Sequence, residues 1–362
     1  MGVMLLFSFS CLRLMPAEQC GGSSSLGTGG PCRTEGPATP QQQPAWLAAM
    51  QADRAATNSR TGYAGGVFDV PALAWTRTAW VQPQFHPFDR FFYSRETKNY
   101  TVRRYLDDLD TRYGGIDAAL MWPTYPNLGA DDRNQFDLYR AMPGGLAAIR
   151  RVTRELNASG VRLLWAYLHW DTETRREPLS DEQTIVQMLK QTGGAGINGD
   201  SLPFVPESFY NESVRQDYPI ALQAEGGTRD AALNWSTLGW GYWGRQSNPG
   251  DAAGYHWTYK TVPLVDRFKF LTSGQYLTTI CERYAKNRTD DLQLAFFNGD
   301  GYESWENVWV QPRSNCICLP AGSVFAHRAP NPCDTDSVPG VAARVPSTHS
   351  SPVTARRCDG LG

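Results

Sequence analysis

The chain has 362 residues, a formal net charge of −2 and an aromatic content of 12%. This length suits one large domain of roughly 200–250 residues with extensions. The near-neutral charge excludes the basic field expected of proteins that bind nucleic acid or anionic membranes. All twelve tryptophans lie between Trp46 and Trp309. Because large rings need a core to bury them, we predict that residues 46–309 form the folded domain.

The two flanks differ in composition from this domain. Residues 1–45 are rich in Gly, Ser, Pro and Gln, and residues 310–362 in Pro, Cys, Ser and Arg. Such segments bury too little apolar surface to offset their chain entropy, so we expect both to be disordered. The tail from residue 310 is either a native disordered segment or sequence that is not native coding sequence.

Localisation and membrane association rest on the same flanks. Residues 1–20 contain an apolar run at 3–11 that is typical of a signal peptide, so a secreted or endomembrane protein is one hypothesis. No apolar run approaches the ~20 residues that cross a bilayer, and we expect no membrane span. The sequence does not indicate an oligomeric state.

Strand-like and helix-like segments alternate from residue 79 onward. The strand-like segments are short apolar runs that end near proline or glycine, and the first five cover residues 79–85, 116–122, 161–168, 195–199 and 219–224. A sixth strand is expected at 240–243 or at 262–265, and a seventh at 292–297. Apolar residues at helical spacing predict helices at 102–113, 144–156, 181–192 and 276–286.

This alternation predicts an α/β fold with a parallel sheet. The number of units favours a (β/α)8-type TIM barrel over an open doubly wound sheet, and no glycine-rich phosphate fingerprint follows the first strand. We find no convincing eighth strand in the tail. The barrel is therefore expected to be incomplete at its C-terminus.

Acidic residues follow several of the predicted strands. Asp200 comes at the end of the fourth strand and Glu225 at the end of the fifth. Barrel enzymes carry their active sites at the rim formed by the C-terminal ends of the strands. Adjacent parallel strands lie about 4.8 Å apart. Glycoside hydrolysis uses two facing carboxylates. We therefore predict Asp200 as nucleophile and Glu225 as general acid/base, while a loop-capping role is the structural alternative for both.

A second acidic group follows the predicted seventh strand. It contains Asp300, Glu303 and Glu306, and either glutamate is an alternative to Glu225 as the acid. Gly299 and Gly301 suit a tight turn that directs side chains toward a site. The alternative is the start of a helix, where acidic residues are favoured.

Aromatic and polar side chains near the strand ends are the predicted substrate-binding set. Sugar faces stack on aromatic rings, and polar groups recognise hydroxyls, although core packing explains many individual rings. The predicted residues are His86, Asp89, Arg90, Trp122, Tyr125, Asn127, Asp132, Arg133, Tyr167, Trp170, Asp171, Asn198, Trp243, Asn298, Asp300 and Trp305. The histidines lack the spacing of metal ligands, so we predict no metal and no cofactor.

Several short motifs resemble a group of glycoside-hydrolase-like TIM-barrel proteins. They are YLDDLD at 105–110, YGGID at 113–117, WPTYPN at 122–127, DDRNQFD at 131–137, MPGG at 142–145, NGD at 198–200 and FFNGDGYESWEN at 296–307. The resemblance covers about residues 79–309. It implies a barrel and a carbohydrate substrate, and it transfers no catalytic assignment.

These observations favour a glycoside hydrolase-like enzyme that acts on a carbohydrate. Two alternatives stay open: a barrel that binds carbohydrate without catalysis, and a truncated product without activity. Replacing Asp200 by Asn and Glu225 by Gln would separate the enzyme from the binding barrel. The two substitutions would abolish turnover in an enzyme, whereas a binding protein would keep its sugar affinity. The sequence does not indicate the sugar, the linkage or the stereochemical outcome.

Overall fold

The computed structural model describes residues 33–35, 37, 39–89, 91–125, 127–225, 228–241, 264–281, 295–296 and 299–303. Eight parallel strands form its central sheet, in the order β12-β11-β9-β8-β7-β6-β5-β2. Their bounds are β2 (Gln84–Phe85), β5 (Ala118–Met121), β6 (Arg162–Leu168), β7 (Gly196–Asp200), β8 (Ala221–Glu225), β9 (Leu238–Gly241), β11 (Leu277–Cys281) and β12 (Gly301–Glu303).

The two edges of this sheet meet. Val81 and Tyr302 form a parallel bridge, and the amide of Gln82 donates to the carbonyl of Tyr302 at 3.0 Å. Following the strand registers once around the sheet displaces the chain by about eight residues, which is the shear of an eight-stranded parallel barrel. The predicted TIM-barrel fold is therefore confirmed.

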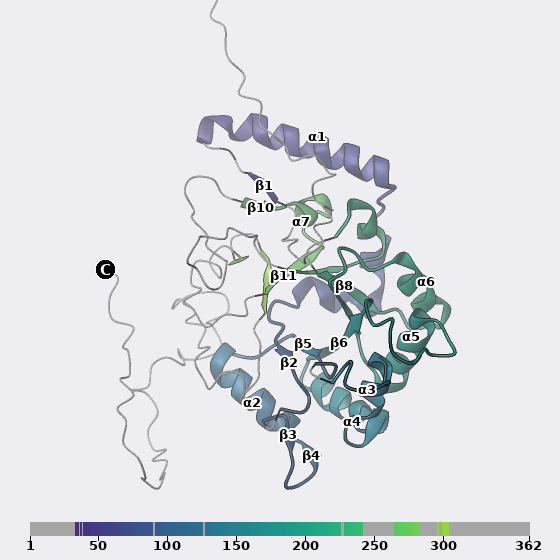
Figure 1. The fold of residues 1–362 in the computed structure, drawn as a ribbon. Coiled ribbons are helices and arrows are strands. Elements are labelled where there is room, and N and C mark those ends of the chain that lie inside the picture. The colour runs from purple at the N-terminus through teal and green to yellow at the C-terminus, as the bar shows by residue number, and fades with distance from the viewer. Residues whose placement is uncertain are drawn as a thin grey trace, which may run out of the picture.

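Helices cover the outside of the first half of the barrel (Figure 1). They are α2 (Val102–Tyr113), α3 (Gln135–Arg140), α4 (Gly145–Ala158), α5 (Asp181–Thr192) and α6 (Glu207–Arg215). The predicted helices at 102–113, 144–156 and 181–192 correspond to α2, α4 and α5. In the described part of the second half, the helical segments are shorter: a 3-10 turn η5 (Asp230–Asn234) and α7 (Arg267–Leu271). Among the described residues, the outer helical layer is therefore incomplete toward the C-terminus.

Local sequence signals explain where α5 begins and ends. The hydroxyl of Ser180 accepts from the amide of Gln183, and the side chain of Gln183 accepts in return from the amide of Ser180, which is a capping box. Gly193 ends the helix at φ 82°, a left-handed conformation that favours glycine. The helix thus has a fixed start just beyond the carboxyl end of β6.

Two apolar clusters separate the faces of the sheet. The outer cluster joins the strands to the helices and includes Phe85, Trp165 and Ile185. The inner cluster fills the barrel with residues such as Leu120 and Leu164. It also contains residues of two 3-10 segments, η3 (Gly66–Asp69) and η4 (Pro71–Thr78). The barrel interior is therefore a packed core, and functional side chains are to be sought at its carboxyl rim.

Two element predictions in the second half differ from the structure, and for a third the structure decides between two candidates. Residues 277–281, predicted as part of a helix, form strand β11, because their β-branched residues pair with β9 on one side and β12 on the other. The sixth strand is β9, whereas the other candidate region contains β10 (Leu264–Asp266), which pairs antiparallel with β1 (Arg33–Glu35). Most of the predicted strand at 292–297 lies outside the described residues, and Ala295 and Phe296 are helical.

The N-terminal flank contains regular structure that was not predicted. It holds β1, a 3-10 turn η2 (Pro40–Gln42) and the start of α1 (Gln43–Thr61). Figure 1 shows α1 along the top of the molecule, beside β1, β10 and α7. A small hairpin of β3 (Tyr93–Ser94) and β4 (Asn99–Tyr100) lies at the opposite side. Residues 1–32 and 310–362 lie outside the described part, so their predicted disorder stays a prediction.

Candidate active site

Asp200 and Glu225 lie at the carboxyl ends of two adjacent parallel strands. The register pairs Gly199 with Ala224, which makes Asp200 and Glu225 the next pair along β7 and β8. The amide of Ser201 donates to Oε2 of Glu225 at 2.6 Å. The carboxylate of Glu225 therefore lies against the residue that follows Asp200, at the same end of the barrel.

One oxygen of Asp200 is held by two donors from neighbouring loops. The hydroxyl of Tyr125 and the indole Nε1 of Trp170 each donate to Oδ2 at 2.9 Å. No donor among the described residues reaches the other oxygen, Oδ1. Asp200 is 7% exposed, so the two bonds form in a largely dehydrated setting where they hold the carboxylate firmly. They leave Oδ1 as the oxygen available to a ligand.

Rings surround this carboxylate. Tyr125 and Trp170 stack with their centroids 6.1 Å apart and an interplanar angle of 17°. Trp122 lies 5.5 Å from Tyr125 and is almost fully buried. Trp170 is 40% exposed. It is thus both anchored to Asp200 by its nitrogen and open to solvent.

His86 follows β2 and is buried beside the loop that carries Trp122 and Tyr125. Burial lowers the pKa of His86 below its ordinary value, and this outweighs the opposing effects of the backbone of Trp122 and Tyr125 and of the nearby Asp89. The imidazole is therefore neutral at pH 7. Asp89 accepts from the amide of Phe91 at 2.7 Å, so its carboxylate stabilises the turn after β2.

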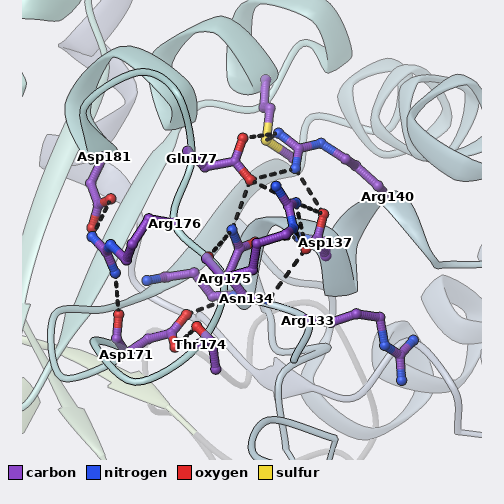
Figure 2. A network of polar contacts seen from close by, with 12 residues as sticks. Arg133, Asn134, Asp137, Arg140, Asp171, Thr174, Arg175, Arg176, Glu177 and Asp181 are labelled. Carbon is purple, nitrogen blue, oxygen red and sulfur yellow. Dashed lines mark hydrogen bonds and ion pairs between the residues drawn. The ribbon is translucent and has the colours of Figure 1, made fainter. Parts of the chain in front are cut away.

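A network of ion pairs fixes the loop that carries Trp170 (Figure 2). Arg140 on α3 contacts both oxygens of Glu177, at 2.8 and 2.9 Å. Arg175 contacts Asp137 at 2.6 Å and Glu177 at 3.2 Å. The pKa of Glu177 is lowered, first by its hydrogen bond with Arg140. These contacts tie the segment between β6 and α5 to α3.

Gln135 and Asp171 connect the same loop to the barrel. The side chain of Gln135 donates to the carbonyl of Leu168 and accepts from its amide, both at 2.8 Å, and so satisfies the backbone at the end of β6 as a neighbouring strand would. Asp171 accepts from the amide of Gln135 at 2.8 Å and from the hydroxyl of Thr174. Asp171 thus holds the loop, and its predicted contact with substrate stays a prediction.

Several other predicted binding residues lie away from the rim or are occupied elsewhere. Tyr167 lies on the outer face of β6, where its hydroxyl donates to Asp181 at 2.9 Å and its ring packs on Phe209. Asp300 precedes β12, so it lies at the amino end of a strand, opposite to Asp200 and Glu225. Both placements correct the prediction. Successive side chains in a strand alternate between faces, which places Tyr167 on the outside of the barrel. Asp300 starts a strand instead of ending one.

The remaining polar residues have structural contacts. Asn198 is buried inside the barrel, where it donates to Gln223 at 3.0 Å. Asn127 donates to the carbonyl of Pro123 at 3.1 Å. Arg133 is exposed and pairs with Asp131, and the carbonyl of the exposed Asp132 accepts from the amide of residue 175.

The second acidic group is only partly described. Glu303 aligns with Cys281 at the end of β12. The side chain of Glu303 is not described, and Arg90, Trp243, Asn298, Trp305 and Glu306 lie outside the described residues.

Three glutamines on or directly before the strands were not among the predicted site residues. Gln82 and Gln223 hydrogen bond to each other at 2.9 Å in the barrel interior, and Gln84 is fully buried two residues further along. The available signal was the alternation Gln82-x-Gln84-x-His86, which marks one polar face on a strand.

The described part of the chain lacks both a metal-binding cluster and a membrane-spanning helix. It contains no group of three or more histidine, cysteine or acidic residues placed to hold a metal ion. None of its helices is long and apolar enough to cross a membrane.

Comparison with known proteins yields similarity to solved structures alone, since neither a family model nor a curated protein matches the chain. Isomaltulose synthase from Erwinia rhapontici NX5 matches at 14% identity and a TM-score of 0.39, over 64% of this chain and 65% of that one. The putative chitinase A from Streptomyces coelicolor matches at 13% identity and 0.39, over 70% and 99%. Trehalose-6-phosphate hydrolase from Bacillus licheniformis matches at 10% identity and 0.40, over 64% and 64%. The chain therefore spans less than two thirds of the first and third structures, and the likeness concerns fold alone.

Proposed function

We propose that the protein is a glycoside hydrolase-like enzyme in which Asp200 and Glu225 act on one glycosidic bond. The observation that carries this proposal is the contact between the amide of Ser201 and Oε2 of Glu225 at 2.6 Å. It brings the Glu225 carboxylate against the end of β7, where Asp200 lies. Two carboxylates on adjacent strands of a barrel rim match the arrangement that glycoside hydrolysis requires.

The short spacing of adjacent strand ends, about 4.8 Å, favours the retaining reaction, whose carboxyl groups are about 5–5.5 Å apart. In the first step, Oδ1 of Asp200 attacks the anomeric carbon while the bond to the leaving oxygen breaks. Protonated Glu225 gives its proton to that oxygen. In the second step Glu225 takes a proton from water, the water oxygen bonds to the anomeric carbon, and Asp200 leaves.

The surroundings of Asp200 support its assignment as nucleophile over Glu225. Tyr125 and Trp170 both donate to Oδ2, so this oxygen is held in place and Oδ1 is left to form the bond to the sugar. Preorganised donors of this kind need no rearrangement during the reaction.

The ring faces beside Asp200 are the proposed sugar platform. Trp170 is exposed, and its nitrogen is fixed on Asp200, so the orientation of its ring relative to the nucleophile is set before a ligand binds. Tyr125 stacks parallel to it. Figure 2 shows the ion-pair network around Arg140, Arg175 and Glu177 that stabilises this loop.

The test compares the wild type with three variants of the full chain on aryl glycosides and on free sugars. Asp200→Asn and Glu225→Gln should each lower kcat by about a thousandfold or more, the range known for loss of a principal catalytic group. Both should keep sugar affinity within a few fold. Glu212→Gln on α6, whose carboxylate pairs with Arg215, is the matched control and should retain full activity.

Each outcome distinguishes the competing functions. Turnover that survives in both variants contradicts the assignment of these carboxylates. A wild-type protein that binds sugars without turnover is instead a carbohydrate-binding barrel, the function that the exposed Trp170 by itself would support. A wild-type protein that neither binds nor cleaves sugars refutes the substrate class.

A further inference from the structure

The interior of the barrel holds a polar layer that the proposed reaction does not use. Gln82 on the approach to β2 and Gln223 on β8 hydrogen bond in both directions, at 2.9 and 3.2 Å. Asn198 on β7 donates to the same oxygen of Gln223 at 3.0 Å. β2 and β8 are four strands apart in the barrel, so this contact crosses the barrel axis and closes the interior below the rim.

One step nearer the rim, the same two strands present Gln84 and Glu225. Side chains two residues apart in a strand point to the same face, about 6.6 Å further along. Gln84 is paired in register with Leu120, a residue of the inner cluster. Gln84 and Glu225 therefore face each other across the axis, directly above the Gln82–Gln223 contact.

Among the described residues, the side-chain amide of Gln84 lacks the hydrogen bonds that Gln82 and Gln223 make. Gln84 is 0% exposed, and neither its oxygen nor its nitrogen has a hydrogen-bond partner in the described part of the chain. The indole nitrogen of Trp122, on the adjacent strand end, is likewise buried without a partner there. Buried polar groups in native proteins are nearly always paired, and an exception calls for a functional or structural cause.

We infer that Gln84 is a ligand-binding residue whose amide hydrogen bonds with a hydroxyl group of the sugar bound between Asp200 and Glu225. The inference rests on the proposed function and adds to it the polar floor of the site. Trp122, which directly follows β5 next to β2 in the sheet, supplies a second donor. An amide is suited to this role because it both donates to and accepts from one hydroxyl. A site built in this way discriminates strongly against a sugar that lacks the hydroxyl, because the buried amide then stays unpaired.

The test uses the full chain, isothermal titration calorimetry and five free monosaccharides: glucose, galactose, mannose, xylose and N-acetylglucosamine. Gln84→Met removes the amide and keeps the length of the side chain. We expect it to weaken binding of the preferred sugar by about tenfold or more without lowering the melting temperature. Gln82→Met is the matched control. It breaks an existing pair and should lower the melting temperature.

Deoxy analogues of the bound sugar identify the contact. One analogue should bind the wild type about tenfold more weakly than the parent sugar and bind Gln84→Met as well as the parent does. Equal sugar affinity in Gln84→Met and wild type would overturn the inference and leave the proposed function intact. A Gln84→Met protein that melts earlier or does not fold would also overturn it, because the amide would then be structural. A wild type that binds none of the five sugars overturns the inference, and it refutes the proposed function as well when aryl glycosides are not cleaved either.

Discussion

The role of Glu177 in holding the loop that carries Trp170 can be tested by measuring stability, without an activity assay. Its side chain is 8% exposed and contacts Arg140 twice, Arg175 once and Asn134 once, at 2.8 to 3.2 Å. Glu177→Gln removes the charge that these donors surround. Breaking a buried ion pair costs about 3–5 kcal/mol, but both arginines are more than a third exposed and solvent screens the pair.

We therefore expect a loss of about 2 kcal/mol in the free energy of unfolding. For a domain of this size that loss lowers the melting temperature by roughly 4–8 °C at pH 7. Calorimetry on the full chain measures it, with Glu173→Gln in the same loop as control, because Glu173 is exposed. The control should change the melting temperature by less than about 2 °C, as surface substitutions do.

The effect should also depend on pH. The pKa of Glu177 is lowered in the folded protein from 4.5, so the unfolded chain takes up the proton first as pH falls. The stabilisation is present above pH 4.5 and is lost as the pH drops through the folded pKa. The difference between wild type and Glu177→Gln should shrink accordingly. The assignment of the ion-pair network as what stabilises this loop would be refuted in two cases. In the first, the stability difference between wild type and Glu177→Gln stays constant down to pH 3. In the second, Glu173→Gln melts as early as Glu177→Gln.

Three further predictions concern the barrel and its rim. Gly196→Ala should destabilise the protein by about 1–3 kcal/mol or more in thermal melts, because an added Cβ would lie 2.2 Å from the carbonyl oxygen of Ala221. Gly66→Ala is the control and should be neutral, because its added Cβ would meet nothing within 4 Å. Because burial lowers the pKa of His86, wild type should lose stability as pH falls below 6.5, and His86→Gln should lose less over that range in urea titrations; equal slopes would contradict a buried neutral imidazole. Trp170→Phe keeps a ring but removes one donor from the proposed nucleophile, so kcat should fall by about tenfold, for roughly 1.4 kcal/mol, and an unchanged kcat would show that this bond does not matter.

The first half of the barrel could be predicted from the sequence because its signals are local. Apolar runs that end at Gly or Pro gave the strands, and Ser180 with Gly193 marked the ends of α5. The strand β11 could not be recognised in this way. Its residues Leu277, Ile280 and Cys281 also fit a helical stripe, and the preference for strand comes from pairing with β9 and β12, which is a tertiary effect.

The position of a candidate site residue could be predicted where only the strand end mattered, and not where the face of the strand mattered. Asp200 and Glu225 needed nothing more than two neighbouring strand ends. Tyr167 was misplaced because β6 is buried on both sides, so its sequence shows no alternation to tell the faces apart. Asp300 was misplaced because the three-residue β12 carries no apolar run of its own.

The bridge between Val81 and Tyr302 joins segments more than 200 positions apart in the chain. During synthesis, therefore, the ring of strands stays open until its last member has left the ribosome, and until then β2 and β11 each offer a bare hydrogen-bonding edge to other molecules. A stop codon or frameshift shortly before Gly301 would make that temporary exposure permanent. Such a chain would keep every carboxylate discussed for the rim of β7 and β8 and still be prone to self-association, so its solubility would fail before its chemistry could be measured.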